Sequence, residues 1–260
     1  MANLEWYQYL LIGLVFVWSG FVRSGLGFGG AVLALPFLLL IVDEPLIFLP
    51  LIAVHLLIFS SWIMWQSHRR QTRFAGMSSN EKTINWGFLG KALKVMIIPK
   101  MLGVVGLLTL SPKLMSSIIF AIVLAYAVGY IANRPIRNQS KVVDNALLAA
   151  GGYFSGTSLT GAPLVIPVFA AHVPKHQLRD TLFVLWFVLT SIKLTSFVVV
   201  GVDLHLIHHL WLFPCAWLGH ILGNRLHTRI VAAETPQFFR ALGIALIVVS
   251  GVGLWRVLAG

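Results

Sequence analysis

The chain has few acidic residues and few charges of any kind. Charged residues make up 10% of its 260 positions, and 8 of them are Asp or Glu. A soluble domain usually carries about 25% charged residues, which form its polar surface. Apolar residues make up 58% of the chain. Too few polar side chains are present to cover a core of that size, so the composition excludes a soluble globular protein.

Cysteine is almost absent as well. Cys215 is the one cysteine and lies inside an apolar segment. It cannot form an internal disulfide, and we expect it to be a packing residue. The first hydrophobic run, 7–25, also lacks the positively charged region that precedes the apolar part of a signal peptide. We therefore expect this run to be retained as a membrane segment.

Long polar stretches are missing too, because ten hydrophobic segments follow one another closely. Their approximate bounds are 7–24, 28–42, 46–65, 86–109, 114–132, 146–156, 162–173, 181–200, 206–223 and 238–258. Segments of roughly 20 apolar residues are long enough to cross a bilayer as helices. Short glycine-interrupted segments at matching positions of two halves are typical of a transporter binding site. The pattern predicts an all-α integral membrane protein with multiple crossings.

Two parts of the sequence match when the chain is shifted by 131 residues. Without a gap, the shift aligns Gly20 with Gly151, Ser24 with Ser155, Gly25 with Gly156, Gly30-Ala31 with Gly161-Ala162, Leu33 with Leu164, and Pro36 with Pro167. Ser-Pro at 111–112 and Thr-Pro at 235–236 each introduce the last segment of a half. The matches indicate an internal duplication. We predict a first repeat over 1–132, a cytoplasmic linker over 133–145 and a second repeat over 146–260.

The basic loops predict how the chain crosses the membrane. Loops 66–84, 133–145 and 224–236 contain clustered arginines and lysines, which favour the cytoplasmic side. This orientation requires each glycine-rich hairpin to return to the side it started from, whether it spans fully or is re-entrant. Each repeat then has an odd number of crossings, so the two repeats are inverted and both termini lie outside. Four-plus-four parallel repeats are the alternative, but they would place Lys175, Arg225 and Arg229 outside.

The formal net charge of +11 has two interpretations. Short basic clusters between membrane segments attract anionic lipid headgroups. A basic protein can also bind nucleic acid, but here the clusters are too short and too divided to form a continuous surface. We expect membrane lipids as partners and no nucleic acid.

Each repeat opens with a break in a hydrophobic hairpin, and these breaks are the candidate binding site. The helix after a break begins with free N–H groups and a positive dipole end, which suit an anion. Glycines leave the backbone accessible, and hydroxyls add hydrogen-bond donors. The candidate residues are Ser24, Gly25, Gly27, Gly29 and Gly30 in the first break, and Ser155, Gly156, Thr157, Ser158, Thr160 and Gly161 in the second. Close packing of helices at small residues is the alternative interpretation.

Three cations lie within hydrophobic segments, whereas every acidic residue lies in a loop or at a segment end. Arg23 is next to the first break, and Lys100 and Lys193 are well inside their segments. A charge inside a membrane is costly and usually faces a partner or an aqueous cavity. The missing negative charge points to an anionic substrate. A guanidinium group also matches oxyanions with two parallel hydrogen bonds, although Lys193 could instead extend to the interface.

The histidines fall into two groups. His205, His208 and His209 cluster near an outer end, where we expect them at the interface. The spacing of the first and last of these would suit a metal, but a third ligand is missing, so we expect no metal site and no cofactor. His55 and His220 are deeper. Each is either a hydrogen-bonded packing residue or a proton relay or substrate contact.

The two breaks resemble the paired motifs of a known transporter family. Gly20-Phe21-Val22-Arg23-Ser24-Gly25-Leu26-Gly27-Phe28-Gly29-Gly30 with Pro36, and Gly152-Tyr153-Phe154-Ser155-Gly156 through Thr160-Gly161-Ala162-Pro163 to Pro167, are similar to the motifs of the sulfite exporter TauE/SafE family. The resemblance covers essentially the whole chain. It implies a permease of the bacterial inner membrane that exports sulfite, sulfoacetate or related organosulfonates.

The chain departs from the usual family pattern at Ala31, where a third glycine is common, and at Arg23. It also has Thr157-Ser158-Leu159-Thr160 where the family is richer in glycine. Added hydroxyls and a guanidinium group suit a sulfonate, but they also suit a carboxylate, so a permease for another small organic anion is an alternative.

Two further alternatives to a transporter are a membrane enzyme and an accessory subunit of a larger complex. An enzyme is disfavoured because the sequence contains no deep carboxylate, no HExxH motif and no Ser–His–Asp set. We therefore expect no enzymatic activity. An accessory subunit would show no flux by itself. A homodimer is a further expectation.

Overall fold

The computed structural model describes residues 4–26, 30–74, 83–132, 140–232 and 236–259. Within these ranges the chain forms ten α-helices and one 3-10 turn, η1, with no strand. The elements are α1 (Trp6–Leu26), α2 (Gly30–Ile41), α3 (Pro45–Phe74), α4 (Trp86–Thr109), α5 (Pro112–Ala132), α6 (Lys141–Ser158), α7 (Ala162–His172), α8 (Lys175–Val200), η1 (Leu206–His208), α9 (His209–Ala232) and α10 (Pro236–Ala259). The all-α prediction is confirmed.

Five parts of the described helices are long and apolar enough to cross a membrane. They are Pro45–Gln66, Trp86–Thr109, Pro112–Gly129, Lys175–Val200 and Leu242–Ala259. The helices α2 and α7 are shorter, as expected, and each contains a proline, Pro36 or Pro167. The prediction of a multi-pass membrane protein is confirmed.

Helix α6 begins earlier than the sequence suggested. It starts at Lys141, within the stretch predicted as linker, and Asp144 lies in its first turn. An acidic side chain at this position interacts favourably with the positive end of the helix dipole. The helix therefore extends beyond its apolar part, because polar residues continue it in a favourable arrangement.

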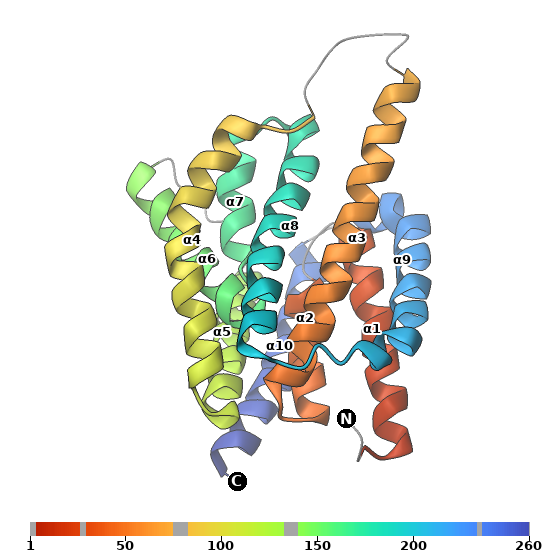
Figure 1. Ribbon diagram of the computed structural model, residues 1–260, viewed down its shortest axis with the longest axis vertical. Helices are drawn as coiled ribbons and strands as arrows, with labels where there is room; N and C mark the ends of the chain where they lie inside the picture. The colour runs from red at the N-terminus through yellow and green to blue at the C-terminus, as the bar shows by residue number, and fades with distance from the viewer. Residues whose placement is uncertain (1–3, 27–29, 75–82, 133–139, 233–235, 260) are drawn as a thin grey trace.

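The helices alternate in direction along the bundle (Figure 1). Both termini lie at the lower end in this view; α3 rises to the upper end, and α8 descends from it. A helix and its counterpart in the other half are five helices apart, so they run in opposite directions. This alternation is what two inverted repeats would produce.

Each half packs against the other through equivalent helix pairs. The most extensive packing joins α1 to α9 and α6 to α4, so the first helix of each half lies against the fourth helix of the other. Figure 1 shows the first pair on one side of the molecule and the second on the opposite side. The counterparts α3 and α8 pack against each other between them, as do α5 and α10. Helices of the two predicted repeats therefore alternate in the packing, while the inverted duplication itself stays a prediction.

Small residues allow the backbones to touch in both of these interfaces. A Cβ atom on Gly20 would lie 2.2 Å from the carbonyl oxygen of Ala216, and one on Gly152 would lie 2.6 Å from that of Met96. Neither gap could hold even a methyl group. Helix pairs in membranes associate by this kind of close packing, because lipid offers little hydrophobic driving force between helices.

The close glycine contacts also show which positions of the two halves are structurally equivalent. A Cβ on Gly223 would meet the carbonyl oxygen of Phe21 at 2.4 Å, and one on Gly103 would meet that of Tyr153 at 2.3 Å. These contacts pair α1 with α6 at an offset of 132 residues rather than the 131 of the sequence match. They pair α4 with α9 at an offset of 120. The sequence match aligned Gly20 with Gly151, whereas the close contacts make Gly152 the counterpart of Gly20. The packing offset and the sequence offset therefore differ by one residue.

Charges of both signs lie at each end of the bundle. Lys141 and Asp144 both lie in the first turn of α6, at the upper end of Figure 1, and α5 begins with Pro112 and Lys113 at the lower end, where the connections containing Asp43 and Asp203 also lie. The described charges therefore do not test which end faces the cytoplasm. The orientation itself stays a prediction.

Candidate functional site

The second break lies inside the protein. Helix α6 ends at Ser158, and Leu159 follows with a φ of 59°, in the left-handed region. The Leu159 side chain packs into a core cluster that includes Phe16 and Phe48 of the first half. Thr160 is fully buried. Irregular backbone at membrane depth is tolerated when protein surrounds it, and the second break meets this condition.

Hydroxyl groups donate hydrogen bonds to a backbone carbonyl oxygen in the last turn of α6. Thr157 Oγ1 donates to the carbonyl oxygen of Phe154 at 3.2 Å, and Ser158 Oγ donates to the same carbonyl at 3.1 Å. Ser158 Oγ and Thr160 Oγ1 are 2.5 Å apart. In this conformation the hydroxyls bond to one another and to the backbone. A substrate would have to exchange these bonds for its own.

Two lysines converge on the second break. Lys100 of α4 and Lys193 of α8 both have an exposed fraction of 0%. Lys100 Nζ donates to Ser155 Oγ at 3.1 Å and lies 3.4 Å from the Ser155 carbonyl oxygen. Lys193 Nζ donates to the Thr157 carbonyl oxygen at 3.1 Å. Both side chains therefore end at the last turn of α6.

Neither lysine has an acidic partner among the described residues. The His–Asp pairs His172–Asp144 and His205–Asp203 lie at the ends of the bundle, away from the second break. The two lysines are instead held by hydroxyl and carbonyl oxygens, and Lys193 Nζ also lies 5.5 Å from the centre of the Phe197 ring.

The first break is described only at its two sides. Gly27 and Gly29 lie outside the described residues, as does the stretch between them. Ser24, Gly25 and Gly30 are buried. Ser19 Oγ donates to the Gly30 carbonyl oxygen at 3.2 Å and so ties α1 to the start of α2.

Arg23 is buried beside the first break, with an exposed fraction of 5%. Its Nη1 atom donates to the carbonyl oxygen of His55 at 3.3 Å. Its guanidinium carbon lies 4.5 Å from the centre of the Phe59 ring, in a cation–π contact. Such a contact stabilises a desolvated cation by about 2 kcal/mol. The aromatic face and the carbonyl take the place of an acidic partner.

Next to Arg23, Ser24 and His220 join α1 to α9. Ser24 Oγ lies 2.5 Å from His220 Nδ1, and Asn224 Nδ2 lies 3.0 Å from His220 Nε2. An amide nitrogen only donates, so Nε2 accepts and Nδ1–H donates to Ser24. The neutral ring is therefore held in one tautomer.

The first cluster (Arg23, Ser24, His55 and His220) and the second cluster (Ser155, Thr157, Ser158, Thr160, Lys100 and Lys193) are separate. No hydrogen bond or ring contact recorded among the described residues joins one cluster to the other. The sequence predicted that the two breaks would meet around a single anion. That stays a prediction, because Gly27 and Gly29 of the first break lie outside the described residues. What the structure describes is one basic cluster in each of the two interfaces between halves.

The close contacts show how the clusters correspond. At the offsets of 132 and 120, Arg23 matches Ser155, and His220 matches Lys100. The α1–α9 interface thus contains Arg23 on its first-repeat helix α1, and the α4–α6 interface contains Lys100 on α4, which corresponds to α9 and not to α1. Sequence matching could not show this, because the equivalent residues differ in type.

Comparison with known proteins gives the family. The sulfite exporter TauE/SafE family model matches residues 11–254, nearly the whole chain. The chain belongs to the sulfite exporter TauE/SafE family. This confirms the resemblance of the two motifs, and the family is one of membrane transporters. No curated protein and no solved structure matches the chain.

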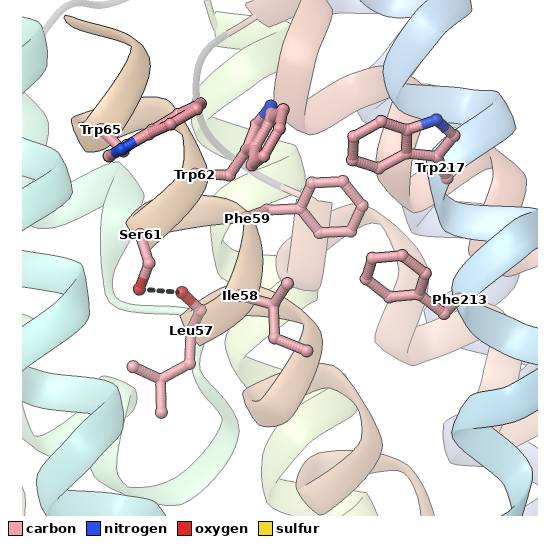
Figure 2. Close-up of a pocket in the computed structure, with 8 residues that line it drawn as sticks. All are labelled: Leu57, Ile58, Phe59, Ser61, Trp62, Trp65, Phe213 and Trp217. Atoms are coloured by element: carbon pink, nitrogen blue, oxygen red, sulfur yellow. Dashed lines mark hydrogen bonds between the residues drawn. The ribbon is translucent and has the colours of Figure 1, made fainter. Parts of the chain in front are cut away.

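This TauE/SafE protein has an aromatic groove next to the first cluster, with a volume of about 700 Å³ (Figure 2). The groove lies between α3 and α9, and Figure 2 shows the rings of Phe59, Trp62, Trp65, Phe213 and Trp217 along it. Its inner wall touches the cluster, because the Phe59 and Trp217 rings lie 5.2 Å and 5.5 Å from the His220 ring. The groove was not expected from the sequence, since tryptophans in a membrane protein suggest interfacial positions.

Two further features of the TauE/SafE chain were not expected. His209, predicted at the interface, lies with its ring centre 5.0 Å from that of the buried His55. His172 Nε2 lies 2.7 Å from Asp144 Oδ2 and joins α7 to α6. In the connection before η1, the N–H of His205 donates to Asp203 at 2.8 Å, and this hydrogen bond lowers the pKa of Asp203.

Proposed function

We propose that the chain exports small sulfur-containing anions such as sulfite, sulfoacetate or related organosulfonates across the bacterial inner membrane. The observation that carries this proposal is the pair of buried lysines at the second break. Two cations share one dry site without a carboxylate, and an anion between them would supply the missing charge.

The lysines have a structural alternative. A cation near the last carbonyls of a helix stabilises the negative end of the helix dipole, and both lysines donate to the last turns of α6. One cation would be enough for that purpose. A second one adds repulsion in a site of low dielectric, where charges interact strongly. The pair is therefore better explained by a ligand.

The start of α7 supports the same site. Gly161 precedes this helix; Pro163 has no N–H and the Leu164 N–H donates to the Gly161 carbonyl oxygen at 3.2 Å, so Ala162 contributes the N–H that a ligand could use. The N-terminus of a helix binds anions through its free N–H groups and its dipole. Hydroxyl groups of the second break would complete the contacts to sulfonate or sulfite oxygens.

Transport requires the site to open to each side in turn. The two sides of the bundle each contain helices from both halves, so rocking of one side against the other would move the breaks. Export of one negative charge gains about 2.3 kcal/mol at an interior potential of roughly −100 mV. We place Arg23 as a second anion contact along this path.

Flux in proteoliposomes tests the proposal. Purified wild-type protein should release labelled sulfite and sulfoacetate, and Lys193→Met should lower that release about 100-fold because the site loses half of its charge. Lys91→Met is the matched control, since Lys91 is exposed on α4. Equal flux from the wild type and Lys193→Met would contradict the assigned site.

The same assay separates the alternatives. A carboxylate could bind the same lysines and hydroxyls, so acetate and malonate should compete weakly if the site prefers sulfonates and strongly if it does not. Chemical turnover of a labelled sulfonate in detergent, where no gradient exists, would instead indicate an enzyme. A lack of flux from the purified chain would point to an accessory subunit.

A further inference from the structure

Two buried imidazole nitrogens face the same region between α3 and α9. His55 Nε2 and His209 Nδ1 are buried, and neither has a hydrogen-bond partner among the described residues. Their ring centres are 5.0 Å apart, with an angle of 36° between the ring planes. Buried polar atoms normally have a partner, so an unpartnered pair needs an explanation.

The other nitrogen of each ring fixes the tautomer. His55 Nδ1 lies 2.7 Å from the Leu51 carbonyl oxygen, and His209 Nε2 lies 3.2 Å from that of Leu204. A carbonyl oxygen only accepts, so each of these nitrogens carries the proton. The two unpartnered nitrogens are therefore both acceptors. Two acceptors cannot bond to each other, but one added proton would give a donor and an acceptor.

The charged groups around the histidines place them beside the proposed anion path. Arg23 of α1 donates to the His55 carbonyl oxygen at 3.3 Å, so a positive charge lies next to that residue. His205 and His208 precede His209 in the chain. The exposed Asp203 carboxylate lies 3.1 Å from His205 Nδ1.

We propose that His55 and His209 form a proton-binding site, and that an anion bound beside Arg23 loads one proton onto it. The inference rests on the proposed anion transport. The proton comes from water at the outer or inner side, binds the lone pair of His55 Nε2 or His209 Nδ1, and is shared between them. Anion and proton then move together in the same direction.

Thermodynamic linkage is the physical reason. Without an anion, the positive charge of Arg23 and the dry surroundings disfavour a second positive charge on His55. An anion neutralises that field, so it raises the affinity for the proton, and the proton raises the affinity for the anion by the same factor. A monovalent anion would then be carried without net charge. Doubly charged sulfite would carry one net negative charge.

Methanesulfonate is a suitable probe because it does not carry a proton of its own. Wild-type proteoliposomes containing a pH dye should show proton movement with methanesulfonate flux, and the flux should not respond to an imposed membrane potential. His209→Gln should lose the proton movement, and any remaining flux should become potential-dependent. His208→Gln is the matched control, because His208 instead accepts from Trp211 Nε1 at 3.2 Å.

The results separate this inference from the proposed function. Anion flux without proton movement in the wild type would overturn the histidine site and leave transport intact. Absence of flux for both sulfite and methanesulfonate would contradict the proposed transport itself.

Nitrogen NMR of the imidazoles gives a readout that does not depend on flux. In purified protein with ¹⁵N-labelled histidine, assigned with the two glutamine variants, the pair should gain a proton on addition of sulfite between about pH 5 and 8. His208→Gln should leave this response unchanged. Rings that stay neutral with sulfite bound would overturn the inference.

Discussion

The two clusters solve the same electrostatic problem in different ways. In the first, Arg23 is stabilised by the Phe59 ring and by a backbone carbonyl, and imidazoles surround it. In the second, Lys100 and Lys193 are held by hydroxyl and carbonyl oxygens at the end of α6. The duplicated backbone therefore allows two chemically distinct sites. The first resembles an aromatic, protonatable site, and the second resembles an oxyanion site.

The largest effect is expected from removing the basic residue of the second interface. Lys100→Met should lower sulfite flux about 100-fold, roughly 3 kcal/mol, because a buried charge that binds the anion is lost. His220→Gln, at the corresponding position, should lower flux only about tenfold, since glutamine keeps part of the hydrogen bonding. Vesicle flux at equal protein content measures both. A larger loss from His220→Gln would place the main anion site at the first cluster.

A second prediction concerns the glycine contacts between halves. Gly103→Ala should destabilise the protein by about 1–3 kcal/mol, because the new methyl group would lie 2.3 Å from a carbonyl oxygen. Gly106→Ala on the same helix has open space and should be neutral or stabilising by up to about 1 kcal/mol. Thermal unfolding in detergent measures the difference.

Gly223→Ala tests whether the two interfaces are equally tight. Its methyl group would lie 2.4 Å from the Phe21 carbonyl oxygen, so the loss of stability should match that of Gly103→Ala. Clearly unequal losses would argue against the structural equivalence of the α1–α9 and α4–α6 pairs.

A smaller effect is expected at the rings that face the cations. Phe59→Leu should lower anion flux about threefold, because part of the cation–π contact of about 2 kcal/mol with Arg23 is lost while leucine keeps the apolar packing. Phe197→Leu should change flux less, because Lys193 Nζ is 5.5 Å from that ring, against 4.5 Å for Arg23 and Phe59. Flux at several sulfite concentrations distinguishes weaker binding from slower turnover. An equal effect of both variants would show that the rings only fill space.

The smallest effect is expected at the contacts that join the start of the first helix to the end of the second in each hairpin, α1–α2 and α6–α7. Asp144→Asn should destabilise the second hairpin by about 0.5–1 kcal/mol, because the partner His172 is partly exposed and its ion pair is weakened by solvent. Gln8→Ala removes the 3.2 Å bond to the Ile41 carbonyl oxygen in the first hairpin and should cost a similar amount. Unfolding in detergent compares them, and a loss of several kcal/mol from either would mean that closure of the hairpin controls the fold.

Much of the architecture could be predicted from sequence because lipid restricts the choices. A hydrophobic segment in a bilayer must form a helix or a closed barrel, so segment lengths and prolines gave the ten helices and the two short members, α2 and α7. The candidate residues Arg23, Lys100 and Lys193 stood out because a buried charge is costly. The structure places all three at low exposure.

The grouping of those residues could not be predicted. Lys100 and Ser155 are far apart in sequence, and their contact exists because Gly103 and Gly156 let α4 and α6 approach closely. His209 was expected at the interface, since it clusters with His205 and His208 near the end of a segment and no local pattern points to His55. Contacts between distant helices depend on backbone separation, which residue spacing along one segment does not encode.

The sequence by itself determined that this is a helical membrane protein of the TauE/SafE family, with a duplicated break and unpaired cations. Those properties follow from composition, hydrophobic length and motif, which need no knowledge of neighbours. The tertiary structure alone decided that the cations separate into two clusters, that Lys100 corresponds to His220, and that His55 faces His209. It did so because the first helix of each half packs against the other half, so every cluster combines side chains from both repeats.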